Sequence, residues 1–97
     1  MRPVQLADIE MAARVLLAHD PGDRVGIMVG LLRKADIADR YRKKTGKRHR
    51  SFGCGTLMSA AAGYRQAGRP AQIGPETLSA LRVVIEGLLA DRSDQDL

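Results

Sequence analysis

Apolar residues recur every three or four positions in the first half of the chain, which is the pattern of amphipathic helices. This spacing predicts one helix over about residues 6–18 and a longer one over about residues 21–44. The apolar stripe of the first helix consists of Ile9, Ala12, Ala13, Leu16 and Leu17. The stripe of the second consists of Val25, Met28, Leu31, Leu32, Ala35 and Ala38, with Tyr41 at its end.

Two more helices are predicted in the second half, over about residues 56–66 and from about residue 75 onward. The apolar residues of the third helix are Leu57, Met58, Ala60, Ala61 and Tyr64. Those of the fourth are Leu78, Leu81, Ile85, Leu88 and Leu89, with Val84 at the edge of the stripe. Residues 91–97 are polar and are expected to fray.

Turn-forming residues separate these segments. We expect Asp20 to cap the second helix, ahead of Pro21, and Gly46 to end it. Three glycines between residues 45 and 55 favour a loop there. No segment alternates apolar and polar residues as a strand does. The sequence therefore predicts one all-α domain over residues 1–97, a compact bundle of about four helices.

The composition favours an aliphatic, alanine-rich core, because Tyr41, Phe52 and Tyr64 are the only aromatic residues. A single cysteine, Cys54, excludes an intrachain disulfide and fits a reducing compartment. No apolar run approaches the ~20 residues of a membrane span, and the N-terminus lacks the pattern of a signal peptide. We therefore expect a cytoplasmic protein without a membrane partner.

Positive charge is concentrated in residues 40–50, which hold seven of the sixteen Lys and Arg residues and no acid. The formal net charge is +5, so the other 86 residues together carry −2. Such a stretch is typical of a contact with a polyanion, and nucleic acid is the partner we expect. Its cations are Arg40, Arg42, Lys43, Lys44, Lys47, Arg48 and Arg50.

Two further interpretations of this stretch stay open. The cations can form a solvated helix end that complements the helix dipole, or they can meet an acidic protein surface. Tyr41 and Phe52 could stack on unpaired bases, although Tyr41 cannot do so if it belongs to the core. Asp36 and Asp39 are expected to pair with Lys34, Arg40 or Lys43.

The turn Gly53-Cys54-Gly55-Thr56 lies just before the predicted third helix. Free amide groups there could hold an anion, with Gly53, Gly55 and Thr56 as the candidate residues. The spacing matches neither a Walker loop nor a dinucleotide-binding motif. A tight turn with Thr56 or Ser51 as the helix cap is the simpler alternative.

Catalytic chemistry has little support in the sequence. Cys54 near His49 suggests a thiolate nucleophile, but a buried or incidental thiol is the expectation we prefer. His19 and His49 lie thirty residues apart and Cys54 has no second cysteine, so no metal-binding pattern is present. We expect no enzymatic activity, no cofactor and no metal.

The chain resembles a small family of short uncharacterised bacterial proteins that share a domain of unknown function. The resemblance extends over the whole chain and is carried by residues 38–42, Thr45-Gly46, and the stretch from Gly53 to Met58 followed by Ala60-Ala61. It implies a bacterial cytoplasmic setting and no particular activity or site.

Together these features predict a small non-enzymatic binding module that contacts nucleic acid through residues 40–50. The alternative is a protein-interaction adaptor or small regulator that uses the same residues against an acidic protein surface. Homodimerisation through an alanine-rich helix face is a further expectation.

Overall fold

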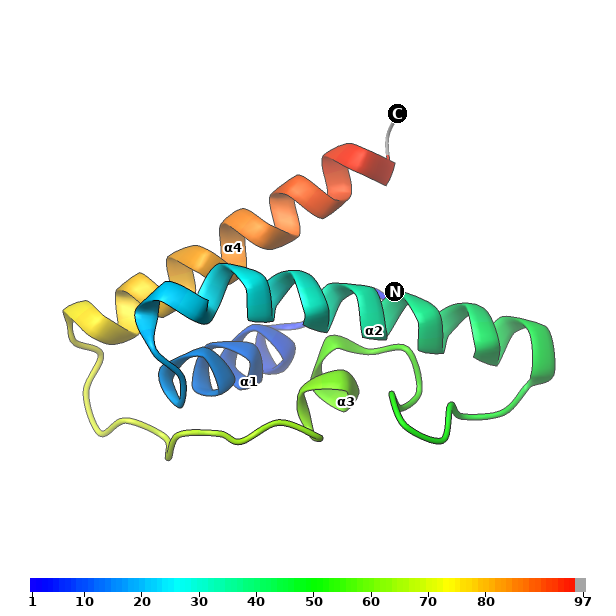
Figure 1. The fold of residues 1–97 in the computed structure, drawn as a ribbon, viewed down its shortest axis with the longest axis horizontal. Helices are drawn as coiled ribbons and strands as arrows, with labels where there is room; N and C mark the ends of the chain where they lie inside the picture. The colour runs from blue at the N-terminus through cyan, green and yellow to red at the C-terminus, as the bar shows by residue number, and fades with distance from the viewer. Residues whose placement is uncertain (96–97) are drawn as a thin grey trace.

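The computed structural model describes residues 1–95 and consists of four α-helices (Figure 1). They are α1 (Leu6–Leu17), α2 (Arg24–Thr45), α3 (Leu57–Ala61) and α4 (Pro75–Gln95), with a short 3-10 turn, η1 (Pro21–Asp23), before α2. Within this part of the chain the only strand-like pairing is an isolated bridge between His49 and Gly53. The prediction of an all-α domain with about four helices is confirmed.

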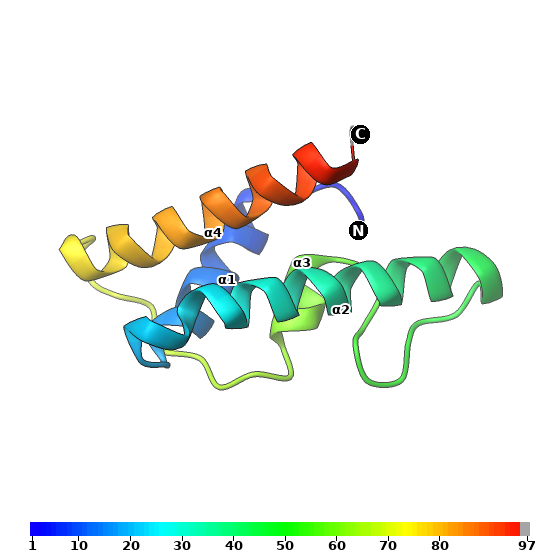
Figure 2. The same ribbon diagram turned by 45° about the horizontal axis from the view of Figure 1, so that its top comes forward.

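Helices α1 and α2 both pack against α3 and α4. Figure 1 shows the first half of α4 passing behind the first turns of α2, and in Figures 1 and 2 the two helices diverge toward the C-terminal end of α4. The N-terminal residues lie between the diverging parts of the two helices (Figure 2), where the α-amino group of Met1 reaches Asp36 and Asp39 of α2. The N-terminal segment therefore belongs to the folded body.

The core is aliphatic and rich in alanine, as the composition predicted, because seven of the fourteen hydrophobic residues buried in the described part of the chain are alanines. Alanines from every helix are almost completely buried, and they allow close approach of the helices. The alanine-rich faces are thus used inside the monomer, and they give no support to homodimerisation through such a face. The buried alanines are Ala12, Ala13, Ala35, Ala38, Ala60, Ala61 and Ala80.

Helix α2 follows the prediction closely, with three differences. Its first predicted turn is the separate 3-10 turn, and the Asp20 side chain makes no capping hydrogen bond there. Gly46 ends the helix as predicted, with a left-handed φ of 72°. Val25, in the predicted stripe, and Tyr41, at its predicted end, are 65% and 41% exposed. Val25 lines an open groove between α2 and α4, and Tyr41 lies near the projecting end of α2.

Helix α3 is much shorter than predicted, because it ends at Ala61 instead of about residue 66. Beyond it the chain forms hydrogen bonds with α1 in place of helical ones. The Ala67 amide donates to the Arg14 carbonyl, and Arg14 Nε donates to the Ala67 carbonyl, both at 2.9 Å. Tertiary contacts thus override the helical preference of this segment, and Tyr64 lies outside the helix.

The predicted buried face of α4 is right for Leu81 and Leu88, which are partly buried against the core, and wrong for the other members of the stripe. Ala80 and Val84 are fully buried, whereas Leu78, Ile85 and Leu89 of the predicted stripe are 57%, 46% and 62% exposed. This helix is apolar around most of its circumference, so periodicity alone does not select the face that packs. The close approach of α4 to α2 selects that face, because a Cβ on Gly87 would lie 2.8 Å from Met28 Cγ.

The C-terminal part of α4 remains helical through Gln95, where the prediction expected fraying from residue 91. Asp96 and Leu97 lie outside the described residues. No helix in residues 1–95 is long and apolar enough to cross a lipid bilayer.

Two buried charged residues, Arg24 and Asp8, connect the helices. Arg24 donates from Nε to the Leu16 carbonyl at 2.8 Å and pairs with Glu76 at 3.2 Å, so it joins α1 to α4. Asp8 accepts from the Gln5 amide at 2.8 Å and from the Met58 amide at 2.9 Å. This carboxylate therefore caps α1 and binds the start of α3 at the same time.

Candidate functional site

The basic segment, residues 40–50, forms the last turns of α2 and the first part of the loop that follows. Figure 1 places this end of α2 at one extremity of the molecule, beyond the region where α1, α3 and α4 pack together. The segment therefore projects from the folded body, and all of its cations except the half-buried Arg42 are exposed.

Three cations on the helical part of the segment pair with carboxylates three or four residues earlier, about one helical turn away. Arg40 pairs with Asp36 at 2.9 Å, in the i,i+4 arrangement that the sequence suggested. Asp39 pairs with Arg42 at 2.8 Å and with Lys43 at 3.3 Å. These two acids lie just outside the acid-free stretch, so the segment is less positive in space than in sequence.

Asp39 is the centre of this charge cluster, and its side chain is 3% exposed. Burial by itself raises the pKa of this carboxyl group. Hydrogen bonds from Arg42, Lys43 and the α-amino group of Met1 outweigh that effect and lower the pKa from 3.8 to about 2. The carboxylate therefore stays ionised at neutral pH and holds the end of α2 to the N-terminus.

Four cations of the segment have no acidic partner within residues 1–95, and all four are exposed. Lys44 lies in the last turn of α2, and the other three lie on the loop. A cation without a carboxylate partner can contact an external anion without first breaking an ion pair. We call these residues the free cations: Lys44, Lys47, Arg48 and Arg50.

The loop that carries three of the free cations is folded around His49. His49 Nδ1 accepts hydrogen bonds from the Ser51 amide at 3.0 Å and the Phe52 amide at 3.1 Å. The His49 amide donates to the Gly53 carbonyl at 2.8 Å, and the Gly53 amide donates back at 3.3 Å. The positions of the flanking cations are therefore set by a hydrogen-bonded turn.

All three aromatic rings of the chain are connected to this turn through His49 and Lys34. The His49 ring stacks on Phe52 with a centroid distance of 4.6 Å, and it meets Tyr41 edge-on at 5.2 Å. Lys34 Nζ lies 5.6 Å from the Phe52 centroid and donates to the Tyr64 hydroxyl at 2.7 Å. Lys34 thus contacts rings instead of the acids that were considered as its partners.

The glycine turn at residues 53–56 is closely packed. Gly53 and Gly55 have φ values of 90° and 100°, a conformation that L side chains rarely adopt. Thr56 caps α3, as one of the alternatives predicted, and accepts from the Ser59 amide at 3.1 Å. The Met58 amide donates to Asp8. Two of the amides at the start of α3 are therefore already bound, and an anion site at Gly53, Gly55 and Thr56 stays a prediction.

Cys54 is half-buried beside this turn. A hydrogen bond from Ser59 lowers the pKa of its thiol, burial opposes this, and Thr56 and Arg2 lower it further, to about 7. His49 Nδ1 is bound to backbone amides, and the Cys54 sulfur contacts Thr56 Oγ1 at 3.8 Å. The cysteine–histidine pair that a thiolate nucleophile would use is not formed.

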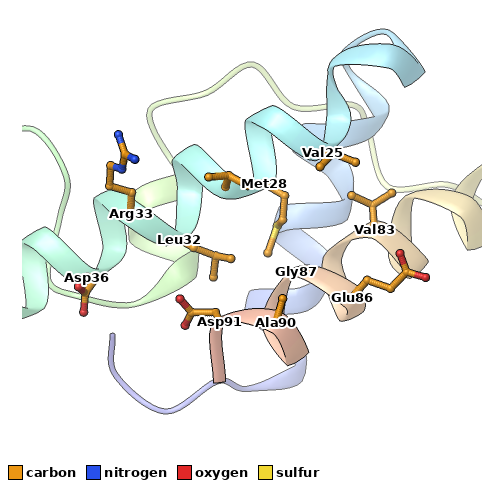
Figure 3. Close-up of a pocket in the computed structure, with 11 residues that line it drawn as sticks. Val25, Met28, Leu32, Arg33, Asp36, Val83, Glu86, Gly87, Ala90 and Asp91 are labelled. Carbon is orange, nitrogen blue, oxygen red and sulfur yellow. The ribbon is translucent and has the colours of Figure 1, made fainter. Parts of the chain in front are cut away.

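Away from the basic segment, an open groove of about 500 Å³ lies between α2 and α4. Figure 3 shows its aliphatic wall, with Met28 and Leu32 of α2 facing Gly87 and Ala90 of α4. Two carboxylates that line it are already engaged, Asp36 with Arg40 and Glu86 with Arg82. No group of three or more potential metal ligands occurs in the part of the chain that the structure describes.

Comparison with known proteins places the chain in a family. No curated protein and no solved structure matches it. The family model described as "Domain of unknown function (DUF7742)" matches residues 2–88, which include the basic segment, the glycine turn and most of α4. The chain is therefore a member of the DUF7742 family, in agreement with the resemblance to a domain of unknown function.

Proposed function

We propose that this protein is a small non-enzymatic binding module that contacts nucleic acid through the basic segment. The free cations make the contact, and the paired cations Arg40, Arg42 and Lys43 chiefly hold the end of α2 in place. Binding is electrostatic and only weakly sequence-specific, because Lys and Arg contact phosphates without reading bases.

One observation carries this proposal: four exposed cations without acidic partners gather at a projecting helix end and its folded loop. A helix C-terminus alone attracts cations to its last carbonyls. That effect explains Arg42, Lys43 and Lys44, but it does not account for Lys47, Arg48 and Arg50, which lie beyond the helix. Contact with phosphates accounts for the cations in the last turn of α2 and also for those on the loop.

Fluorescence anisotropy with a labelled DNA duplex over a range of salt concentrations tests the proposal. Four phosphate contacts predict a log–log salt slope of about −3.6, whereas contacts by all seven cations predict about −6. The absence of binding at low salt would reject the proposal.

Charge-reversal variants separate this site from the general charge of the protein. The double variant Lys47→Glu, Arg48→Glu should abolish most of the binding. The control is Arg33→Glu with Arg92→Glu, which changes the net charge equally at exposed positions outside the segment. Equal losses in both variants would show that net charge, and not the free cations, drives binding.

An adaptor that binds an acidic protein surface is the second candidate function. Exposed aliphatic side chains on α2 and α4 favour it, since Val25, Val29 and Leu89 are each more than half exposed. Affinity purification from cell extract with and without nuclease distinguishes the candidates. A partner that survives nuclease treatment and is lost in the Lys47→Glu, Arg48→Glu variant supports the adaptor.

A further inference from the structure

We propose that the nucleic acid held by the basic segment is double-stranded and is bound through its phosphate backbone. This inference rests on the proposed function and names the substrate class for the same site. It depends on how the protein uses its aromatic rings and on the fixed shape of the cationic loop.

Proteins that bind single strands combine cations with aromatic faces on which successive bases stack. Phe52 lies next to the free cations in sequence, but its stacking surface is used within the protein. The His49 ring is parallel to it within 1°, with centroids 4.6 Å apart, and the Lys34 ammonium also lies over the ring. A base can compete for Phe52 only against contacts that hold the loop together.

Tyr64 is engaged in the same way, by the same lysine. Its hydroxyl accepts from Lys34, and the Lys34 ammonium lies 4.5 Å from its ring centroid. The hydroxyl also comes within 3.5 Å of the Cβ position of Gly30, in the first half of α2. Lys34 therefore occupies the Tyr64 hydroxyl and lies against its ring, so Tyr64 does not offer a free surface on which a base could stack.

Tyr41 is the remaining ring, and it is 41% exposed. Its contact with His49 is edge-on, so part of its surface is open to solvent. A single ring offers a place for one base and does not form the row that tracks a strand. The basic segment thus offers charge without a stacking platform.

The cationic loop also suits a rigid partner. Lys47, Arg48 and Arg50 flank His49, whose Nδ1 and backbone together hold the turn by four hydrogen bonds. These bonds fix the backbone from which the cations extend, so no loop ordering is needed when the cations meet phosphates that are themselves in fixed positions. A duplex provides such phosphates, at a higher linear charge density than a single strand.

A paired anisotropy measurement tests this inference. The probes are a labelled DNA duplex of about 20 base pairs and unstructured oligo(dT) of the same length, long enough for several phosphate contacts. The duplex should bind roughly ten-fold tighter or more at low salt. Tyr41→Leu, which removes the exposed ring, should leave the ratio of the two affinities unchanged while circular dichroism confirms the helical fold.

The outcomes separate this inference from the proposed function. Equal or tighter binding of oligo(dT), especially if Tyr41→Leu weakens it, overturns the duplex inference and leaves the proposed function standing. If neither probe binds at low salt, the duplex inference and the proposed function are both rejected. If the protein prefers the duplex and the Lys47→Glu, Arg48→Glu variant loses that preference, the duplex inference and the proposed function are both supported.

Discussion

Gly55 packs directly against Asp39, so that the loop before α3 touches the backbone of α2. A Cβ on Gly55 would lie 2.8 Å from the Asp39 Cβ and 2.9 Å from its Cα. Gly55 also has a φ of 100°, which favours glycine. This contact holds the glycine turn against the charge cluster that orders the end of α2.

Gly55→Ala should therefore be strongly destabilising. Backbone strain and steric overlap together predict a loss of about 3 kcal/mol in the free energy of unfolding. Urea denaturation followed by circular dichroism measures it. Gly26→Ala is the matched control in α2, where no atom lies within 4 Å of the added Cβ. It should stabilise the protein by roughly 0.5–1 kcal/mol. Similar effects at the two positions would contradict the packing described for Gly55.

Asp39 should make stability depend on pH in the acid range. Its pKa is lowered from 3.8 to about 2 in the folded protein, so the unfolded chain binds the proton more readily. The stabilisation is fully present above about pH 5 and is lost as the pH falls through about 4 toward about 2. Its size is about 2 kcal/mol.

Denaturation at a series of pH values, compared with Asp39→Asn, measures this contribution. The difference in stability between the wild-type protein and the variant should shrink as the pH falls from about 5 to about 2. A difference that stays constant over this range would mean that the Asp39 charge does not act through its pairs with Arg42, Lys43 and the N-terminus.

Cys54 should react as a thiolate near neutral pH. Its pKa of about 7 predicts that about half of the thiol is ionised at pH 7. The rate of alkylation by iodoacetamide should therefore rise with a midpoint near pH 7. Ser59→Ala removes the hydrogen bond that lowers the pKa most and should move the midpoint upward. Thr56→Ser keeps the hydroxyl and should leave the midpoint where it is. A midpoint near that of a free thiol in the wild-type protein would refute this assignment.

Replacing Asp8 and replacing Asp20 should have very different effects on stability. Asp8 lies in the first turn of α1, and Asp20 directly precedes η1. Asp8 is buried and accepts from the Gln5 and Met58 amides, so Asp8→Ala leaves two donors without their acceptor. The expected loss is about 2–3 kcal/mol.

The exposed Asp20 side chain makes no capping hydrogen bond, so Asp20→Ala should change stability by less than about 0.5 kcal/mol. Thermal denaturation of the two variants is the measurement. A larger loss for Asp20→Ala would mean that the sequence-based assignment of Asp20 as a helix cap was right.

Local sequence patterns were sufficient for the helical class, for α1 and for the end of α2. The i,i+3 and i,i+4 spacing of Ile9, Ala12 and Leu16 predicts α1 because an amphipathic face defines its own orientation. Gly46 predicts the end of α2 because a left-handed residue is a local requirement. The cluster of cations in residues 40–50 is likewise visible in the sequence itself.

Tertiary contacts decided the features that local patterns leave open. The face of α4 that packs depends on the close approach of Gly87 to Met28, since apolar residues surround most of that helix. The end of α3 depends on the hydrogen bonds between Ala67 and Arg14.

Which cations of the basic segment are paired and which are free also required the tertiary structure. The sequence does not reveal that Met1, Gly55 and Lys34 lie close to this segment and to the loop that follows it. The fold brings the N-terminus to Asp36 and Asp39 beside Arg40, Arg42 and Lys43. It also turns Phe52 and Tyr64 toward Lys34. The sequence by itself determined that one stretch is basic, and the tertiary structure decided which of its charges remain free.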